Sequence, residues 1–179
     1  ERATLDNNLL TKNYEYEVNR IIETYLENDS ADPYYIARIF INENFDTDSR
    51  EFVFVKVKSL LDNFLSYFDM RDLKQNILYK RYKFKYSINN KPVILRSCVF
   101  SVNVDGGNIE IINLVTKDIA KKDFNSFLGT KILIVALYFL ENHKCESIIL
   151  KNFNLKTSEM KVLSDSIFFV KDFHDFLIK

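Results

Sequence analysis

The strongest constraint on the fold is a change of hydrophobic period near residue 70. Before that point, apolar residues recur every three or four positions, which is the spacing of amphipathic helices. From residue 81 to 115 they largely alternate with polar residues, as in half-buried strands. A run of helices followed by neighbouring strands is typical of the α+β class.

The first part of the chain predicts two helices. Apolar residues from Leu10 to Leu26 form one stripe on a single helix. Asp32 followed by Pro33 marks the next start, because Asp can cap free amides and proline at the first position loses no hydrogen bond. That helix is expected to end near Asn44.

Residues 45–69 are more ambiguous. Asp48 and Glu51 have capping-box spacing. Residues 52–58 alternate like a strand, but apolar residues at a helical period continue beyond them, and the longer match favours a helix through Asp69. The residues at this period are Val53, Val57, Leu60, Leu61, Phe64 and Phe68.

The middle of the chain predicts an antiparallel meander. Residues 82–88 alternate rings with cations, so we expect the aromatics inward and the cations outward. Residues 93–104 and 109–115 follow as strands, joined by a hairpin at Asp105–Asn108, where glycine supplies a positive φ. A change of apolar phase predicts a bulge or a switch of buried face at residues 110–112.

The last third predicts mixed elements. Residues 124–139 have a helical period, and the apolar run 132–140 favours a central buried helix over the meander, with a strand as the alternative. A short strand at 147–151, a short helix from 157 or 158 to 163, an extended segment at 167–170 and a closing segment at 173–178 complete the chain. The expected core positions are Val99, Phe100, Ile132, Val135 and Phe139.

We therefore expect one α+β domain of 179 residues, and charge is sorted along it. Residues 1–69 hold 7 Lys or Arg against 14 Asp or Glu, and residues 70–122 hold 11 against 4, whereas residues 123–179 are balanced. Either the first two segments dock on each other, or each offers a charged face to a different partner.

Known catalytic patterns are missing from the sequence. It has no GxGxxG or GxxxxGK[ST] loop and no GxSxG motif, so we expect no cofactor and no nucleotide-dependent reaction. His143 has the position of a helix C-terminus, and His174 and Asp175 are adjacent, so their side chains are expected to point apart.

Metal and redox sites are not expected either. Asp29, Asp32, Asp46 and Asp48 could surround a metal ion, but residues 46–50 lack the central glycine and the terminal Glu of a calcium loop. Helix capping explains these carboxylates better. Cys98 and Cys145 are expected to be buried, inert thiols, since no CxxC or His pair supports a zinc site and nothing supports a disulfide.

These exclusions favour a non-enzymatic interaction domain that assembles with itself or with another protein. The alternative is single-stranded nucleic-acid (RNA) binding through a basic strand, with Arg81, Lys83 and Lys85 holding phosphates. An enzyme with scattered carboxylates is a third hypothesis. The candidate partner-facing acidic residues, which would otherwise neutralise the basic strand internally, are Glu15, Glu17, Glu23 and Glu27.

The setting is expected to be intracellular, in the cytoplasm or nucleus, with no membrane association. The longest apolar run, residues 132–140, is about half of what spanning a bilayer requires. The first residue is Glu, which suggests an excised domain or a processed chain.

Overall fold

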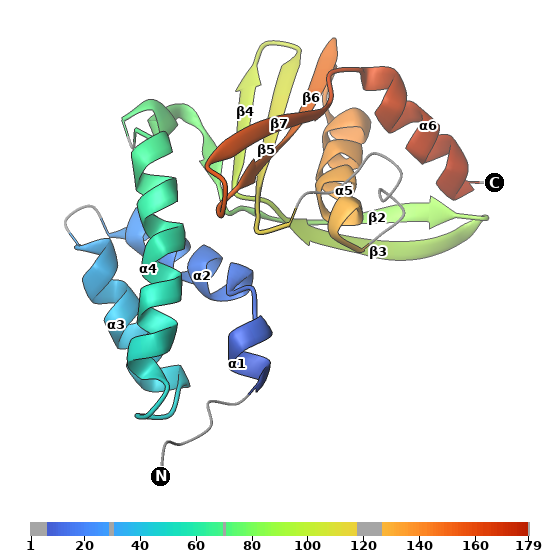
Figure 1. Cartoon of the computed structure of the whole chain (residues 1–179). Helices are drawn as coiled ribbons and strands as arrows, with labels where there is room; N and C mark the ends of the chain where they lie inside the picture. Colours follow the sequence, from blue (N-terminus) through green and yellow to red (C-terminus); the bar gives the residue numbers. More distant parts are fainter. Residues whose placement is uncertain (1–6, 29–30, 70, 118–126, 179) are drawn as a thin grey trace. The chain divides into compact units, whose positions relative to one another are not determined.

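The structure is a computed structural model that describes residues 7–28, 31–69, 71–117 and 127–178 (Figure 1). It divides into two compact units. The helical unit comprises residues 1–69 and 155–158, and the sheet unit comprises residues 70–154 and 159–179. The first boundary falls where the charge of the sequence changes from acidic to basic.

The helical unit contains α1 (Asn7–Thr11), α2 (Glu15–Glu27), α3 (Pro33–Asn44) and α4 (Arg50–Tyr67). Helices α2, α3 and α4 pack on one another. The apolar period of α3 predicts burial of Tyr35, Ile36, Ile39 and Phe40, but this is wrong: these side chains are exposed or half-buried, and α3 buries Ala37 and Ile41 instead. The predicted stripes of α2 and α4, together with these two residues, supply buried side chains of the unit. These include Val18, Ile21, Ile22, Ala37, Ile41, Val53, Val57, Leu61 and Phe64.

The prediction of a single long helix from Leu10 to Leu26 is wrong, because the helix is interrupted before α2 by the backbone conformation of Tyr14. That residue has a left-handed backbone, with φ of 55°. Its hydroxyl donates to the Leu9 carbonyl at 2.9 Å, and the Glu15 amide bonds the Asn13 side chain. These local bonds and the burial of the ring offset the strain of a non-glycine residue in this conformation.

The next two helices follow the sequence more closely. Asp32 caps α3, accepting a hydrogen bond from the Tyr34 amide at 3.0 Å with Pro33 at the first position. Residues 52–58 lie within α4, so the prediction of a helix from the longer apolar period is confirmed. The capping box at Asp48 is wrong: Ser49 precedes the helix, and its hydroxyl donates to the Asp46 carbonyl instead of capping an amide.

In the described residues of the sheet unit, a 3₁₀ turn at Asp72–Gln75 is followed by seven strands. Five form one sheet in the order β1-β4-β5-β6-β7, in which β5 and β6 are parallel and the other pairs antiparallel. Strands β2 and β3 form a separate hairpin. The bounds are β1 (Ile77–Leu78), β2 (Arg81–Ile88), β3 (Lys91–Cys98), β4 (Ser101–Asp105), β5 (Asn108–Val115), β6 (Ser147–Asn154) and β7 (Glu159–Ser164).

The predicted meander is present, with two differences. The strand predicted over 93–104 is interrupted at Val99 and Phe100, so that β3 belongs to the hairpin and β4 to the sheet. The bulge predicted at 110–112 is wrong, since β5 pairs with β4 and β6 without a register shift. The phase changes because this end of β5 is buried on both faces.

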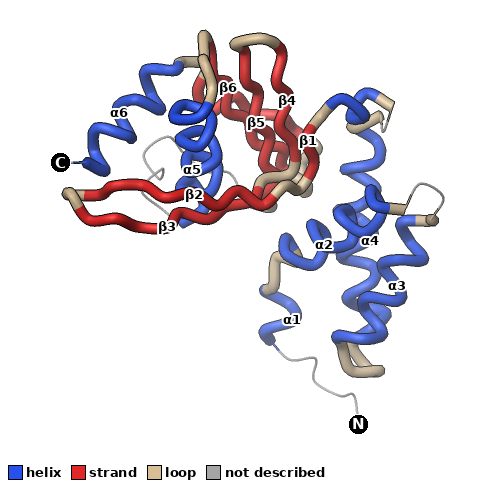
Figure 2. The backbone as a smooth tube through the Cα atoms, turned by 180° about the vertical axis from the view of Figure 1, so that it is seen from behind, coloured by secondary structure: helices blue, strands red, loops and turns tan. Residues whose placement is uncertain are grey.

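Helix α5 (Phe127–Asn142) lies between the five-stranded sheet and the hairpin (Figures 1 and 2). Its run of apolar residues requires cover on more than one side, and the two β elements supply it. The predicted start at Phe124 lies outside the described residues. All five predicted core residues are buried, and four of them, all but Phe100, belong to the cluster around α5.

The C-terminal predictions were partly wrong. Residues 159–164 form β7 rather than a short helix, because Ser158 turns the chain with φ of 57° and the segment pairs with β6. Residues 167–170 begin α6 (Ile167–Ile178) rather than an extended segment. Val170 and its neighbours pack on the cluster around α5. Tertiary contacts therefore determine the secondary structure of both β7 and α6. The fold is nonetheless α+β, as predicted.

Within the described ranges 7–28, 31–69, 71–117 and 127–178, no helix combines the length and the apolar character needed to cross a membrane.

We expect Phe139→Ala to lower the free energy of unfolding by about 3–5 kcal/mol, because the ring is buried between α5 and the hairpin and its removal leaves a cavity. Phe168→Ala is the control, since that side chain is 69% exposed on α6. Urea unfolding of both variants provides the measurement. A loss below about 1 kcal/mol for Phe139→Ala would contradict this packing.

Candidate functional site

The outer surface of the β2–β3 hairpin carries four exposed cations, Arg81, Lys83, Lys85 and Arg96, which we call the basic face. Residues two apart on a strand point to the same side, and residues directly opposite each other on paired strands share a face. Lys83 is opposite Arg96 in the register. The cations therefore form one surface, and β2 alternates exposed and buried positions as its sequence predicts.

The inner surface of the hairpin is fixed to α5 and α6 by aromatic contacts. The Tyr82 ring lies 4.9 Å from Tyr138 and 5.6 Å from Phe139, measured between centroids. Phe84 contacts Tyr138 at 5.6 Å, and Tyr86 contacts His174 at 5.7 Å. These buried rings fix which side of the hairpin faces the helices and leave the basic face pointing away from them.

Acidic side chains of the described residues form no ion pair with the basic face. Residues 80–98 contain six Lys or Arg and no Asp or Glu. In the part of the chain that the structure describes, none of the four cations of the basic face pairs with a carboxylate. A surface of one charge sign attracts ligands of the opposite sign.

A pocket of about 390 Å³ lies on this hairpin. It is lined by Arg81, Lys83 and Arg96 together with Tyr82, Ser97 and Cys98, and its wall is mostly apolar. The stems of long cationic side chains commonly supply apolar surface of this kind while their charged ends stay in water. The pocket thus combines apolar walls with three positive charges.

Two tyrosines beneath the hairpin are protected from ionisation. Burial, followed by the charges of Tyr138 and Cys98, raises the pKa of Tyr82 to about 12. Burial, followed by Glu141 and Asp175, raises the pKa of Tyr86 to about 12. Both phenols are therefore neutral at physiological pH and add no negative charge to the basic face.

His174 has a partner that its sequence neighbours did not suggest. The Tyr86 hydroxyl hydrogen-bonds the His174 Nδ1, and the Glu141 carboxylate lies 3.5 Å from the same nitrogen. The sequence indicated only Asp175, which is adjacent in the chain. His143 directly follows the C-terminus of α5, as predicted, and its amide bonds the Phe139 carbonyl.

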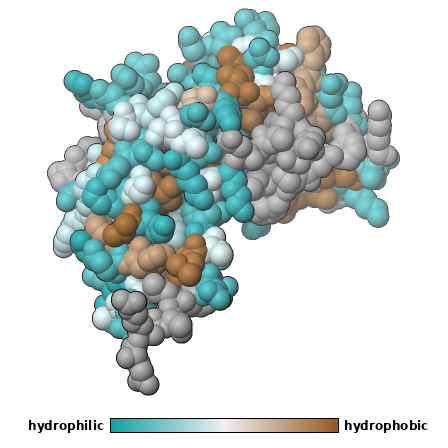
Figure 3. Space-filling view, viewed as in Figure 1, coloured by the Kyte–Doolittle hydropathy of each residue, from teal (hydrophilic) through white to brown (hydrophobic). Residues whose placement is uncertain are grey.

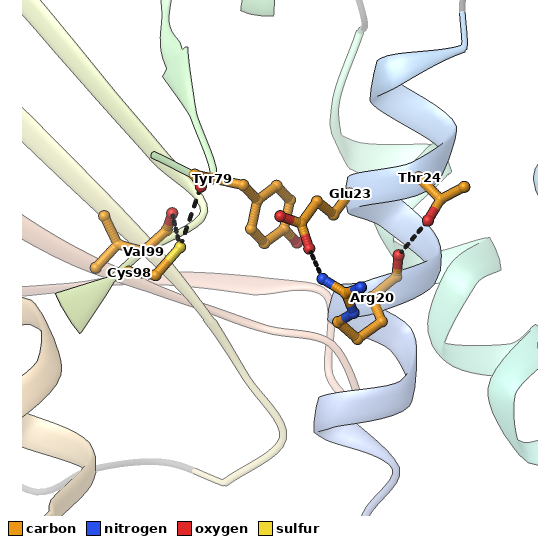
Figure 4. A network of polar contacts seen from close by, with 6 residues as sticks. All are labelled: Arg20, Glu23, Thr24, Tyr79, Cys98 and Val99. Carbon is orange, nitrogen blue, oxygen red and sulfur yellow. Dashed lines mark hydrogen bonds and ion pairs between the residues drawn. The ribbon is translucent and has the colours of Figure 1, made fainter. Parts of the chain in front are cut away.

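The four candidate acidic residues lie on α2, and Glu17 and Glu23 form ion pairs inside the helical unit. Glu17 is 5% exposed and pairs with Lys12. Glu23 pairs with Arg20 at 2.5 Å, and Figure 4 shows this pair with the Thr24 hydroxyl bonding the Arg20 carbonyl. Glu15 is half-buried, and Glu27 is exposed at the end of the helix.

Both cysteines are free, as predicted, but they are half-buried rather than buried. The Cys98 thiol donates to the Tyr79 carbonyl at 3.3 Å (Figure 4), and the Cys145 thiol donates to the Phe139 carbonyl at 3.3 Å. Burial raises the pKa of Cys145, which disfavours its reactive thiolate form.

A metal centre is not evident. The described residues contain no group of three or more His, Cys, Asp or Glu that could hold a metal ion. Asp32 acts as a helix cap, and the Asp46 carbonyl accepts bonds from Ser49 in the turn before α4. Asp29 lies outside the described residues.

Sequence reasoning missed Arg96 as a member of the basic face. The signal was present in the turn: once Asn89 and Asn90 close the hairpin, the register places Arg96 opposite Lys83. Ile94, opposite Lys85, was missed in the same way and is exposed between the cations.

We expect Tyr82→Phe to reduce the loss of stability at alkaline pH. The pKa of Tyr82 rises from 10.0 to about 12 on folding, so its contribution is complete below pH 10 and is lost as the pH rises towards 12. Among the described residues the Tyr82 hydroxyl has no hydrogen-bond partner, so the substitution breaks no bond there. Urea unfolding below pH 10 and near pH 12 measures the difference, with exposed Tyr35→Phe as the control. Equal losses in wild type and Tyr82→Phe would contradict the shift.

Comparisons with known proteins do not assign the chain to a family. No family model matches it, and no curated protein matches it. Among solved structures, a crystal structure of SSO0001 is similar over 99% of this chain and 87% of that chain, with 9% identity and a TM-score of 0.32. Likeness at this level carries no argument about function.

Proposed function

We propose that this chain is a non-catalytic binding protein whose basic face holds the phosphates of a single-stranded nucleic acid. The observation that carries the proposal is a set of four exposed cations on one side of a hairpin that contains no acidic residue. Successive cations on β2 stand about 6.6–6.8 Å apart, because each is two residues from the next on a strand. An extended polynucleotide running along β2 would meet them in turn.

The burial of the aromatic residues decides the kind of recognition. Tyr82 and Tyr86 are buried and Phe84 is half-buried on the inner face, so these rings are not platforms on which bases stack. Contact with phosphates positions a strand without reading its sequence. The proposed binding along β2 therefore depends on charge and has little dependence on sequence, and its affinity falls as salt concentration rises.

We expect replacement of Arg81, Lys83, Lys85 and Arg96 by Gln to abolish binding of a labelled single-stranded oligonucleotide at physiological salt. If the four cations contact four phosphates, the slope of log K against log salt becomes shallower by about 3, since each phosphate contributes about 0.7 for single strands. Fluorescence anisotropy across a salt series measures both quantities.

The matched control replaces four exposed lysines elsewhere, Lys56, Lys117, Lys144 and Lys171, by Gln, which changes the net charge equally. The control should retain most of the affinity. Equal losses in the two variants would indicate a net-charge effect and contradict a defined site. Unchanged affinity of the basic-face variant, together with lower stability, would also contradict the proposal and indicate that these cations are paired within the chain.

A second candidate function, self-association, is favoured by a different observation. Tyr35 and Ile39 lie one turn apart on one side of α3 and are 64% and 42% exposed. Isolated exposed apolar residues are ordinary, but two neighbours on a helix face can form the centre of a contact. In Figure 3 the apolar side chains over the helices are separate spots among hydrophilic ones, which favours a small interface.

We expect the wild-type chain to sediment with a concentration-dependent mass over the micromolar range, and Tyr35→Ser with Ile39→Ser to sediment as a monomer. The paired serines remove the apolar contact without disturbing the buried side of α3. Phe168→Ser, a single exposed aromatic residue on α6, is the control. A wild type that remains monomeric at every concentration would contradict self-association.

A further inference from the structure

The pocket on the hairpin has a mostly apolar wall, and contact with phosphates alone does not use this wall. Three of the four cations of the basic face, Arg81, Lys83 and Arg96, line the pocket. A phosphate needs charge and hydrogen-bond donors, whereas the mostly apolar wall suits an uncharged, flat group. The volume of about 390 Å³ lies within the range of pockets that take small organic ligands.

We infer that this pocket receives one base of the bound strand, held between the guanidinium groups of Arg81 and Arg96. This inference rests on the proposed function and names the part of the nucleotide that the site takes. In the register Arg81 is opposite Cys98 and Lys83 is opposite Arg96, so the two arginines are diagonal neighbours on one face. Such neighbours are about 7–8 Å apart, which leaves room for a ring between two planar groups.

The chemistry of arginine favours this arrangement. A guanidinium is planar and weakly hydrated, and it stacks on flat π systems, including unstacked bases. Lys83 lies between the arginines in chain order and can hold the phosphate of the same nucleotide as a point charge. One nucleotide would thus use both the charge and the apolar wall of the pocket.

Two polar side chains that line the pocket, Ser97 and Cys98, already have partners. The Ser97 hydroxyl donates to the Lys131 carbonyl at 2.8 Å, and the Cys98 thiol donates to the Tyr79 carbonyl at 3.3 Å. Base identity is normally read by hydrogen bonds to base edges, and these two groups are engaged elsewhere. The pocket should therefore accept any base, with preference set by stacking strength.

The test compares two labelled ligands in the full chain: single-stranded oligothymidine, and a sugar–phosphate chain of the same length without bases. A base in the pocket makes the oligothymidine bind about 5- to 150-fold more tightly, which is the range for one stacked base. Replacing Arg81 and Arg96 by Lys keeps every positive charge but removes both planar guanidinium groups. This double variant should bind the two ligands equally, at the affinity of the baseless chain.

The matched control replaces Arg38 and Arg71, two exposed arginines outside the hairpin, by Lys, which makes the same chemical change and leaves Arg81 and Arg96 in place. It should retain the difference between the two ligands, and circular dichroism verifies that each variant is folded. Equal binding of both ligands by the wild type would overturn the base pocket and leave phosphate binding intact. A difference that survives in the lysine variant would also overturn it.

Failure of the proposed function has a separate signature, because neither ligand then binds at physiological salt. An acidic protein partner is distinguished by competition with polyglutamate. If polyglutamate displaces the oligothymidine as efficiently as unlabelled oligothymidine does, the site recognises charge alone and the base pocket is overturned. Weak displacement by polyglutamate supports the inference.

Discussion

The need to cover α5 governs the architecture of the sheet unit. Nine consecutive apolar residues, 132–140, leave this helix without a polar side in its centre, so no single neighbour can bury it. The five-stranded sheet contacts it from one direction and the β2–β3 hairpin from another, and α6 packs against it as well. Burial of large apolar side chains contributes about 1.5–3 kcal/mol each, so the buried residues of this helix stabilise the unit.

The chemistry of the exposed surface follows from this requirement. A hairpin that contributes Tyr82, Phe84 and Tyr86 to the cover of α5 must send the alternate residues of β2 the other way. Those residues are Arg81, Lys83 and Lys85, and the register adds Arg96 from β3. The same alternation that stabilises the fold therefore collects the cations on one face, where no carboxylate of the hairpin opposes them.

Sequence patterns predicted the elements whose signals are local. Asp32 and Pro33 predicted the start of α3, the glycine pair predicted the β4–β5 turn, and the apolar run predicted α5. The helical period of the apolar residues also predicted α4 correctly, although residues 52–58 alternate like a strand. In each case the main local pattern agrees with the tertiary contacts, so local information is sufficient.

The failures arise where contacts that the hydrophobic period does not show determine the structure. The break at Tyr14 uses a left-handed conformation that a non-glycine residue adopts only when its surroundings offset the strain. Strand β7 exists because β6 offers it an edge, and the start of α6 is set by packing on the cluster around α5. Arg96 was missed because membership of a face across two strands depends on register, which only the turn defines.

The link between the fold and the proposed function can be tested most directly by nuclear magnetic resonance of the labelled full chain titrated with a single-stranded oligonucleotide. Binding on the basic face predicts that backbone amide shifts change first along residues 81–85 and 94–98, while the buried centre of α5 changes little. Shift changes confined to the helical unit, with none on the hairpin, would contradict the assignment of the site.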